Sequence, residues 1–170
     1  MRWFLKTPLK KRPKVKYPVT IIRHPKERVS KCSLNGVQEV IECTFLKASN
    51  KLEFDATGYI VLQIDAPVLS AADAGRPLVL LDSTWRLLPQ LIACVQGSPI
   101  FRSLPPEIAT AYPRVSKLYK DPQQGLASIE ALYLALKILG TDEKRLLDNY
   151  FWKEQFLANV ANVANGTNTQ

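Results

Sequence analysis

The stretch that decides the fold reads RPLVLLDSTW and spans residues 76–85. Its centre, residues 77–81, is apolar without alternation, which is typical of a strand that is covered on both faces in a parallel sheet. The apolar run ends at Asp82, and the two hydroxyl residues that follow can cap a helix. Open α/β sheets bind ligands beyond the carboxyl ends of such strands, so Asp82 is either a ligand-site carboxylate or simply a helix cap. The stretch predicts an α/β domain.

Other segments complete this domain on the same reasoning. Strands are predicted at residues 17–22, 39–46 and 59–64, where β-branched and other apolar residues gather. A helix is predicted from Leu126 to Gly140, because apolar residues recur there at helical spacing and glycine is a common helix stop. A final helix is predicted from Thr141 to about Ala164.

The composition is that of an ordinary globular chain. Its 170 residues suffice for one domain with a sizeable core, and 46% of them are hydrophobic and 22% charged. The sequence has no apolar run of the roughly 20 residues that a membrane span needs, and no secretory-type apolar segment follows the basic N-terminus. Three scattered cysteines and one histidine match neither a disulfide framework nor a zinc site. We therefore expect a cytoplasmic protein without a metal or a membrane partner.

Positive charge is concentrated at the N-terminal end. Residues 1–31 hold 11 Lys and Arg against one acid, a balance of +10, whereas the rest of the chain holds 12 bases and 14 acids. Prolines interrupt residues 1–16, so we expect a flexible basic arm there. Such an arm can bind the phosphate backbone of a nucleic acid, or it can be only a solubilising tail. The scarcity of acids favours nucleic acid.

A second candidate for nucleic-acid contact lies at residues 111–119. This segment combines basic residues with Tyr112 and Tyr119, and such side chains can stack on bases and pair with phosphates. Each tyrosine can equally be a half-buried packing residue. Composition and periodicity alone thus give an α/β domain with a basic arm, and they do not name a reaction.

Three short motifs resemble a known enzyme superfamily. The DSTW segment at residues 82–85 resembles the D-x-T-W signature of the DTW-domain proteins, which are tRNA-uridine aminocarboxypropyltransferases. GLASIEAL at residues 125–132 resembles the second motif of that family, although Ala127 and Ser128 depart from its usual residues. HPKE at residues 24–27 is similar to the family's H-P-x-E segment.

Two further segments resemble a related branch of the superfamily. KCSL at residues 31–34 and FWKEQFLAN at residues 151–159 look like the ribosome-biogenesis enzymes that modify small-subunit rRNA. That branch usually carries D-C-S-W where this chain has DSTW. The resemblance covers roughly residues 17–160 with its pieces in the family order, and it indicates the superfamily rather than the branch.

The resemblance implies an α/β fold with a SPOUT-like sheet and a C-terminal trefoil knot. On that basis the chain divides into a basic flexible arm (1–16), a small N-terminal α/β portion (17–66), a SPOUT-like cofactor-binding portion (67–164) and a frayed tail (165–170). Composition cannot predict a knot, because knotted chains are nearly absent among folds. Relatives in this superfamily are often monomers, so a monomer is expected.

The resemblance also implies a reaction. S-adenosylmethionine would donate a 3-amino-3-carboxypropyl group to a uridine or pseudouridine in structured RNA, with small-subunit rRNA favoured over tRNA. Asp82, at the D-x-T-W position, is then the candidate catalytic residue, as a base for the weakly acidic ring N–H or as an orienter of the target base. The residues expected around the cofactor are Thr84, Trp85, Leu88, Leu104, Tyr112, Ser128 and Glu130. Those expected at RNA phosphates are Lys10, Lys11, Arg12, Arg23, Lys26, Arg28 and Lys31.

Other interpretations stay open at this point. Trp85 can be an ordinary core residue, and Glu130 can serve only the dipole of its helix. A SPOUT-type RNA methyltransferase would use the same cofactor and RNA but would add a methyl group. A non-catalytic RNA-binding or ribosome-assembly factor would keep the basic arm and would not need the cofactor.

Overall fold

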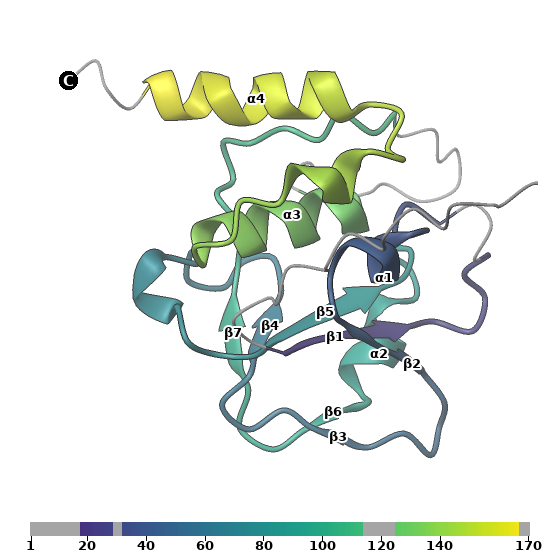
Figure 1. The fold of residues 1–170 in the computed structure, drawn as a ribbon. Coiled ribbons are helices and arrows are strands. Elements are labelled where there is room, and N and C mark those ends of the chain that lie inside the picture. The colour runs from purple at the N-terminus through teal and green to yellow at the C-terminus, as the bar shows by residue number, and fades with distance from the viewer. Residues whose placement is uncertain (1–17, 29–31, 114–124, 167–170) are drawn as a thin grey trace, which may run out of the picture.

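The computed structural model describes residues 18–28, 32–113 and 125–166, and these residues form an α/β fold around a parallel sheet (Figure 1). Within them, five strands lie in the order β2-β1-β5-β4-β7, and each neighbouring pair is parallel. The strands are β1 (Val19–Arg23), β2 (Thr44–Lys47), β4 (Ile60–Leu62), β5 (Leu78–Asp82) and β7 (Ile100–Arg102). A second, two-stranded parallel sheet pairs β3 (Phe54–Asp55) with β6 (Val95–Gln96).

The predicted central strand is β5, and it is buried along its whole length. Its side chains alternate between two hydrophobic clusters, because successive residues of a strand point to opposite faces. Leu78 and Leu80 belong to the larger cluster, whereas Val79 and Leu81 belong to the smaller one. The run without polar alternation at residues 77–81 therefore reflects a strand covered on both faces, as the sequence predicted.

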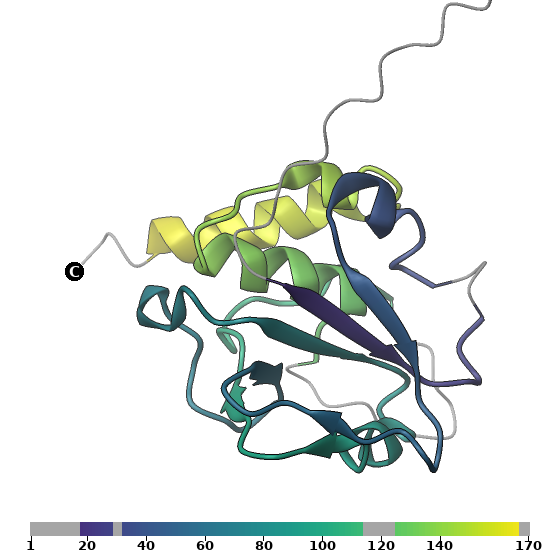
Figure 2. The same cartoon turned by 60° about the horizontal axis from the view of Figure 1, so that its bottom comes forward.

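Helices cover both faces of the sheet (Figures 1 and 2). The larger cluster lies under α1 (Val37–Val40), α3 (Ser128–Ile138), the 3-10 helix η3 (Lys144–Leu147) and α4 (Lys153–Gly166). The smaller one lies under α2 (Leu88–Ile92) and the β3–β6 pair. A short 3-10 helix, η2 (Ala71–Asp73), precedes β5. In the described part of the chain, the helices are too short or too polar to span a bilayer.

The structure corrects the predicted SPOUT-like sheet with a C-terminal trefoil knot. The described residues form the parallel α/β sheet given above, and no knot appears in them. Strands of the 17–66 portion and of the 67–164 portion alternate in one sheet, since β1 and β4 both pair with β5. The prediction rested on short motifs, and such motifs fix side chains at a site without fixing the path of the chain. The basic arm at residues 1–16 lies outside the described residues.

Two predicted elements differ from the observed ones. The segment 39–46 holds the end of α1 and most of β2 rather than one strand. Gly36 has a left-handed backbone (φ 84°) that turns the chain into α1, and this turn places Val37 and Ile41 in the core. The predicted final helix is split into η3 and α4, because the intervening turn buries Tyr150 against α3.

Candidate active site

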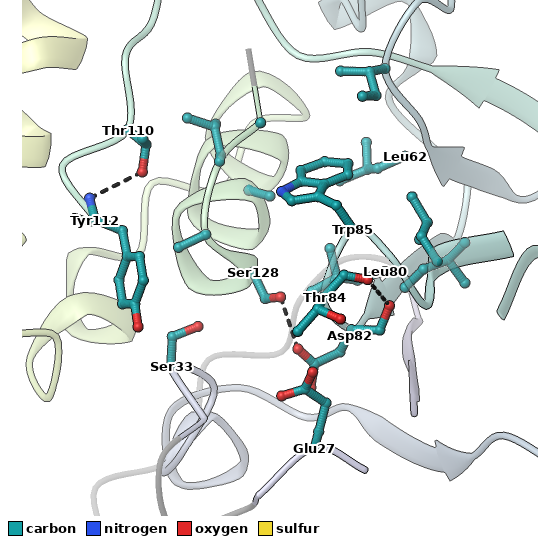
Figure 3. Close-up of a pocket in the computed structure, with 18 of the residues that line it drawn as sticks. Glu27, Ser33, Leu62, Leu80, Asp82, Thr84, Trp85, Thr110, Tyr112 and Ser128 are labelled. Atoms are coloured by element: carbon teal, nitrogen blue, oxygen red, sulfur yellow. Dashed lines mark hydrogen bonds between the residues drawn. The ribbon is translucent and has the colours of Figure 1, made fainter. Parts of the chain in front are cut away.

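A cavity of about 510 Å³ opens at the carboxyl edge of the sheet. All five strands end at this edge, and open α/β sheets place their ligands there. The walls of the cavity come from the segments that follow β1, β4, β5 and β7 and from the start of α3 (Figure 3). The DSTW segment, residues 82–85, lies in the middle of these walls.

The register of the sheet explains why three polar side chains meet in the cavity. Arg23 ends β1 directly opposite Asp82, which ends β5. Both face α3, because Ile21 and Leu80, two residues earlier on each strand, pack in the cluster beneath α3. Ser128, the first residue of α3, donates a hydrogen bond to Asp82 Oδ1 at 2.8 Å. Asp82 is buried, so these contacts replace its hydration.

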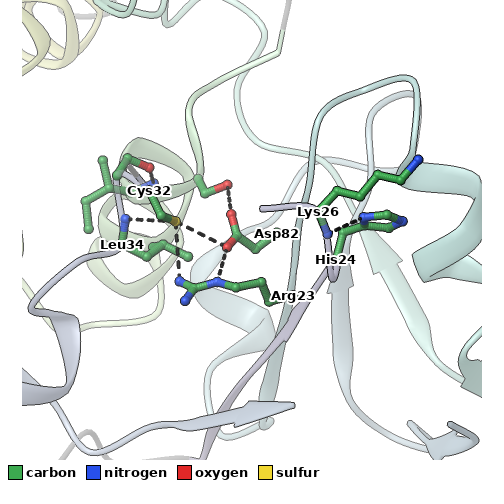
Figure 4. Close-up of polar contacts among 9 residues, drawn as sticks. Arg23, His24, Lys26, Cys32, Leu34 and Asp82 are labelled. Carbon is green, nitrogen blue, oxygen red and sulfur yellow. Dashed lines mark hydrogen bonds and ion pairs between the residues drawn. The ribbon is translucent and has the colours of Figure 1, made fainter. Parts of the chain in front are cut away.

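The other oxygen of Asp82 accepts two more hydrogen bonds. Arg23 Nε donates to Oδ2 at 2.8 Å, and the Cys32 thiol donates to the same atom at 3.3 Å (Figure 4). Arg23 Nη2 in turn donates to Cys32 Sγ at 3.3 Å, and the guanidinium lies over the ring of Phe45. Burial and the Asp82 charge raise the pKa of the Cys32 thiol to about 11, so the thiol stays protonated and remains a donor. Three donors from three segments therefore hold Asp82.

Trp85 packs against the segment that leads into α3. A Cβ atom on the buried Gly125 would overlap the indole ring and would lie 2.7 Å from Cε2 and 3.0 Å from Nε1. Only glycine allows the backbone to approach the ring this closely. The ring of Trp85 lines the cavity beside Leu62 (Figure 3). The first residue of the GLASIEAL motif thus fixes the last residue of the DSTW motif.

A second carboxylate, Glu27, lies in the cavity wall next to Asp82 (Figure 3). It belongs to the turn after β1, where its N–H donates to the His24 carbonyl at 3.0 Å. Burial and the negative charge of Asp82 raise the pKa of Glu27, and this outweighs a hydrogen bond from the Thr84 N–H and the charge of Arg23. Glu27 is therefore a cavity-lining carboxylate with an increased affinity for a proton.

Glu130 has a different role from the predicted contact with a cofactor. It is fully buried in the first turn of α3 and is not part of the cavity wall. Its carboxylate accepts hydrogen bonds from the N–H groups of Ala111 and Ala127 and from the hydroxyls of Thr110 and Tyr150, at 2.6–2.9 Å. Glu130 thus ties the loop after β7, which forms one wall of the cavity, to α3.

The remaining predicted cofactor residues all lie in the cavity wall. They are Thr84, Trp85, Leu88, Leu104, Tyr112 and Ser128. These residues come from three segments that are distant in the sequence, and the fold brings them to one cavity. Their contacts with a bound ligand stay predictions.

The predicted RNA-contacting residues fall into three groups. Lys26 and Arg28 are exposed in the turn after β1. Arg23 differs from the prediction, since its side chain is only 15% exposed and binds Asp82 rather than facing outward. Lys10, Lys11, Arg12 and Lys31 lie outside the described residues.

The sequence motifs contained functional candidates to which sequence reasoning gave no role. Glu27 is the last residue of HPKE, and Cys32 is the second residue of KCSL. Both line the cavity beside Asp82. Ser33, from the same KCSL segment, accepts the Ile129 N–H at 3.2 Å and so supports the start of α3. Their positions within the HPKE and KCSL motifs were the sequence signal that marked them as candidates.

His24 has a structural role. Its Nδ1 accepts the Lys26 N–H at 3.1 Å, and its Nε2 lies 2.8 Å from Gln90 Oε1 (Figure 4 shows the first contact). Because Nδ1 accepts a hydrogen bond, Nε2 must carry the proton and donate to Gln90. The buried ring joins the turn after β1 to α2. Among the described residues, no cluster of three or more His, Cys, Asp or Glu side chains could hold a metal ion.

Comparison with known proteins identifies one solved structure with a similar fold. It is the SAM-dependent rRNA:acp-transferase Tsr3 from Vulcanisaeta distributa, which aligns with a TM-score of 0.63 and 25% sequence identity. The alignment covers 84% of this chain and 77% of the Tsr3 chain. Neither a protein-family model nor a curated protein sequence matches the chain. This similarity supports the resemblance to aminocarboxypropyltransferases. It does not support assignment of the chain to the DTW-domain proteins.

Proposed function

We propose that this protein transfers the 3-amino-3-carboxypropyl group of S-adenosylmethionine to a uridine or pseudouridine of small-subunit rRNA. The observation that carries this proposal is the cavity built around the DSTW segment, on a fold shared with an rRNA acp-transferase over 84% of the chain. Two sequence segments that resemble the rRNA-modifying branch, KCSL and FWKEQFLAN, support rRNA over tRNA.

The cavity suits S-adenosylmethionine in size and in lining. Its volume of about 510 Å³ falls within the range of small-ligand pockets, about 300–1,000 Å³. Leu88 and Leu104 offer apolar walls for an adenosine, and the ring of Trp85 suits a sulfonium cation. The carboxylates of Glu27 and Asp82 complement the positive charge of this donor.

Selectivity in this reaction depends on position. When bound, S-adenosylmethionine supplies a carbon beside a positively charged sulfur, and that carbon, not the methyl group, must face the ring nitrogen of the RNA. Trp85, held in place by Gly125, fixes one side of the cavity. On the other side Arg23 and Ser128 hold Asp82 in a single position, where it orients the target base.

The rim of the cavity offers contacts for RNA. Lys26 and Arg28 are exposed in the turn after β1, where they flank the cavity-lining Glu27 in the sequence, and they can pair with phosphates. Tyr112 lines the cavity, is 47% exposed and meets the ring of Trp152 edge-to-face at 5.2 Å. Trp152 makes a similar contact with Phe151, which is 87% exposed. Splayed RNA bases stack on such aromatic rings, so these rings can receive nucleotides that flank the target.

Three further features belong to the same proposal. The basic arm, with Lys10, Lys11 and Arg12, adds sequence-independent affinity for the RNA backbone together with Lys31. The protein acts as a monomer. It works in the cytoplasm, with S-adenosylmethionine and RNA as its partners and without a metal.

The adenosine by-product distinguishes this function from methyl transfer. The purified protein is incubated with S-adenosylmethionine and small-subunit rRNA, and the nucleosides that form are separated and weighed by mass spectrometry. Aminocarboxypropyl transfer yields methylthioadenosine, whereas methyl transfer yields S-adenosylhomocysteine. Methylthioadenosine that depends on added rRNA supports the proposal. S-adenosylhomocysteine would assign a methyltransferase, and rRNA binding without either product would assign a non-catalytic binding factor.

A further inference from the structure

The cavity holds two carboxylates, and they are not equivalent. Asp82 comes from the DSTW motif, and Glu27 comes from the turn after β1 (Figure 3). The proposed reaction needs one group to accept the proton of the ring N–H, because the neutral nitrogen of an imide is a poor nucleophile. The group that accepts this proton needs a carboxylate oxygen that is available to the target base.

Both carboxylate oxygens of Asp82 already accept hydrogen bonds from neighbouring side chains. Its Oδ2 accepts from Arg23 Nε at 2.8 Å and from the Cys32 thiol at 3.3 Å, and its Oδ1 accepts from the Ser128 hydroxyl at 2.8 Å. It is only 3% exposed and forms an ion pair with a guanidinium. These hydrogen bonds occupy both carboxylate oxygens and hold the group in one orientation. Asp82 is therefore suited to positioning other groups in the cavity.

Glu27 has a different environment. It is half-buried in the cavity wall, and the nearby negative charge is that of Asp82. The Thr84 N–H of the DSTW segment and the nearby Arg23 and His24 act in the opposite direction and favour the charged form of Glu27. Burial and the Asp82 charge together raise the pKa of Glu27. A base is most effective when its pKa approaches the working pH, so these surroundings improve Glu27 as a proton acceptor.

We propose that Glu27 is the base of the transfer reaction and that Asp82 is a positioning residue. This proposal rests on the function proposed above. A Glu27 carboxylate oxygen takes the proton as the ring N–H bond breaks, and the nitrogen electron pair forms the new N–C bond. The C–S bond breaks with its electron pair left on sulfur, so the neutral thioether leaves as methylthioadenosine. The fixed Asp82 anion raises the basicity of Glu27 by its charge and orients the target base.

The test compares Glu27→Gln with Asp82→Asn over a range of pH. Single-turnover transfer to small-subunit rRNA is measured with saturating S-adenosylmethionine, and donor affinity is measured separately by equilibrium dialysis. Glu27→Gln is expected to slow transfer at neutral pH by about 10²–10⁴-fold, the usual contribution of a placed base, with donor affinity changed only a few-fold. Glu107→Gln serves as the control, because Glu107 is an exposed carboxylate of the loop after β7 and does not line the cavity.

The shape of the pH profile separates a base from a structural residue. As the pH rises, the ring N–H ionises without help from a base. The ratio of the wild-type transfer rate to the Glu27→Gln rate should therefore fall by about tenfold per pH unit. The corresponding rate ratio for Asp82→Asn should stay constant with pH, because hydroxide does not restore the orientation of the target base. A constant deficit for Glu27→Gln, or a shrinking deficit for Asp82→Asn alone, would overturn the assignment of Glu27. Wild-type protein that forms no aminocarboxypropyl product would overturn the proposed function itself.

Discussion

The contact between Gly125 and Trp85 allows a sharp test of the site. In Gly125→Ala, the added Cβ would lie 2.7 Å from Trp85 Cε2. Carbon atoms in contact are normally about 3.5–4.0 Å apart, so the ring must withdraw by roughly 1 Å. Overpacking of this kind costs about 1–3 kcal/mol, which lowers the Tm of a chain of this size by about 2–12 °C. A displacement of about 1 Å in a catalytic site can reduce the rate by about 10²-fold.

The assay combines three measurements on the same preparation. Thermal unfolding gives the Tm, calorimetric titration gives the Kd for S-adenosylmethionine, and single-turnover transfer gives the rate. Gly166→Ala is the matched control, because nothing lies within 4 Å of its added Cβ at the end of α4. Trp85→Phe should relieve part of the stability loss when it is combined with Gly125→Ala, since the two residues are in contact. Wild-type values of Tm, Kd and rate in Gly125→Ala would refute this account of how Trp85 is held.

Three other substitutions test the polar contacts around the cavity. Arg23→Met leaves the Asp82 carboxylate buried without its cation, so we expect a loss of about 3–5 kcal/mol of unfolding free energy, measurable by urea denaturation. The Glu130 carboxylate accepts hydrogen bonds from four donors, and in Glu130→Gln an amide NH₂ faces two of them. We expect the unfolding free energy to fall by about 2–4 kcal/mol in the same assay. An unchanged stability in either variant would contradict the contacts described. Glu27→Gln should instead stabilise the protein at neutral pH. The pKa of Glu27 is raised by folding, so its favourable contribution exists below its ordinary pKa of 4.5 and is lost as the pH rises through the folded value. Unfolding measured from pH 4 to pH 8 should therefore show a gain for Glu27→Gln that grows with pH, and a gain that is constant would be inconsistent with a titrating carboxylate.

The sequence predicted the central strand that ends at Asp82, and the structure shows the physical reason. An uninterrupted apolar run that ends at Asp82 is typical of a strand buried on both faces, and β5 is buried in that way. The helix predicted from the apolar spacing after Leu126 is likewise present as α3. Both signals are local, because they depend on the periodicity of a single segment.

Other features depend on contacts between distant segments, and the sequence could not predict them. Arg23 was expected at RNA phosphates, but the pairing of β1 with β5 places it opposite Asp82 inside the site. Glu130 was expected at the cofactor, whereas its four donors come from a loop, from a turn and from its own helix. Glu27 was overlooked, since nothing in HPKE reveals that this turn lies against the DSTW segment. The knot was an inference from the family resemblance, and the described residues do not contain one.

Labelled S-adenosylmethionine distinguishes transfer of the aminocarboxypropyl group from transfer of the methyl group. Small-subunit rRNA and tRNA are incubated separately with the protein and with S-adenosylmethionine that carries its label either in the carboxyl group or in the methyl group. The proposed function predicts that carboxyl label enters small-subunit rRNA, that methyl label does not, and that Trp85→Ala abolishes the incorporation. Methyl label without carboxyl label in the RNA would contradict it, because the cavity would then present the wrong carbon of the donor to the base.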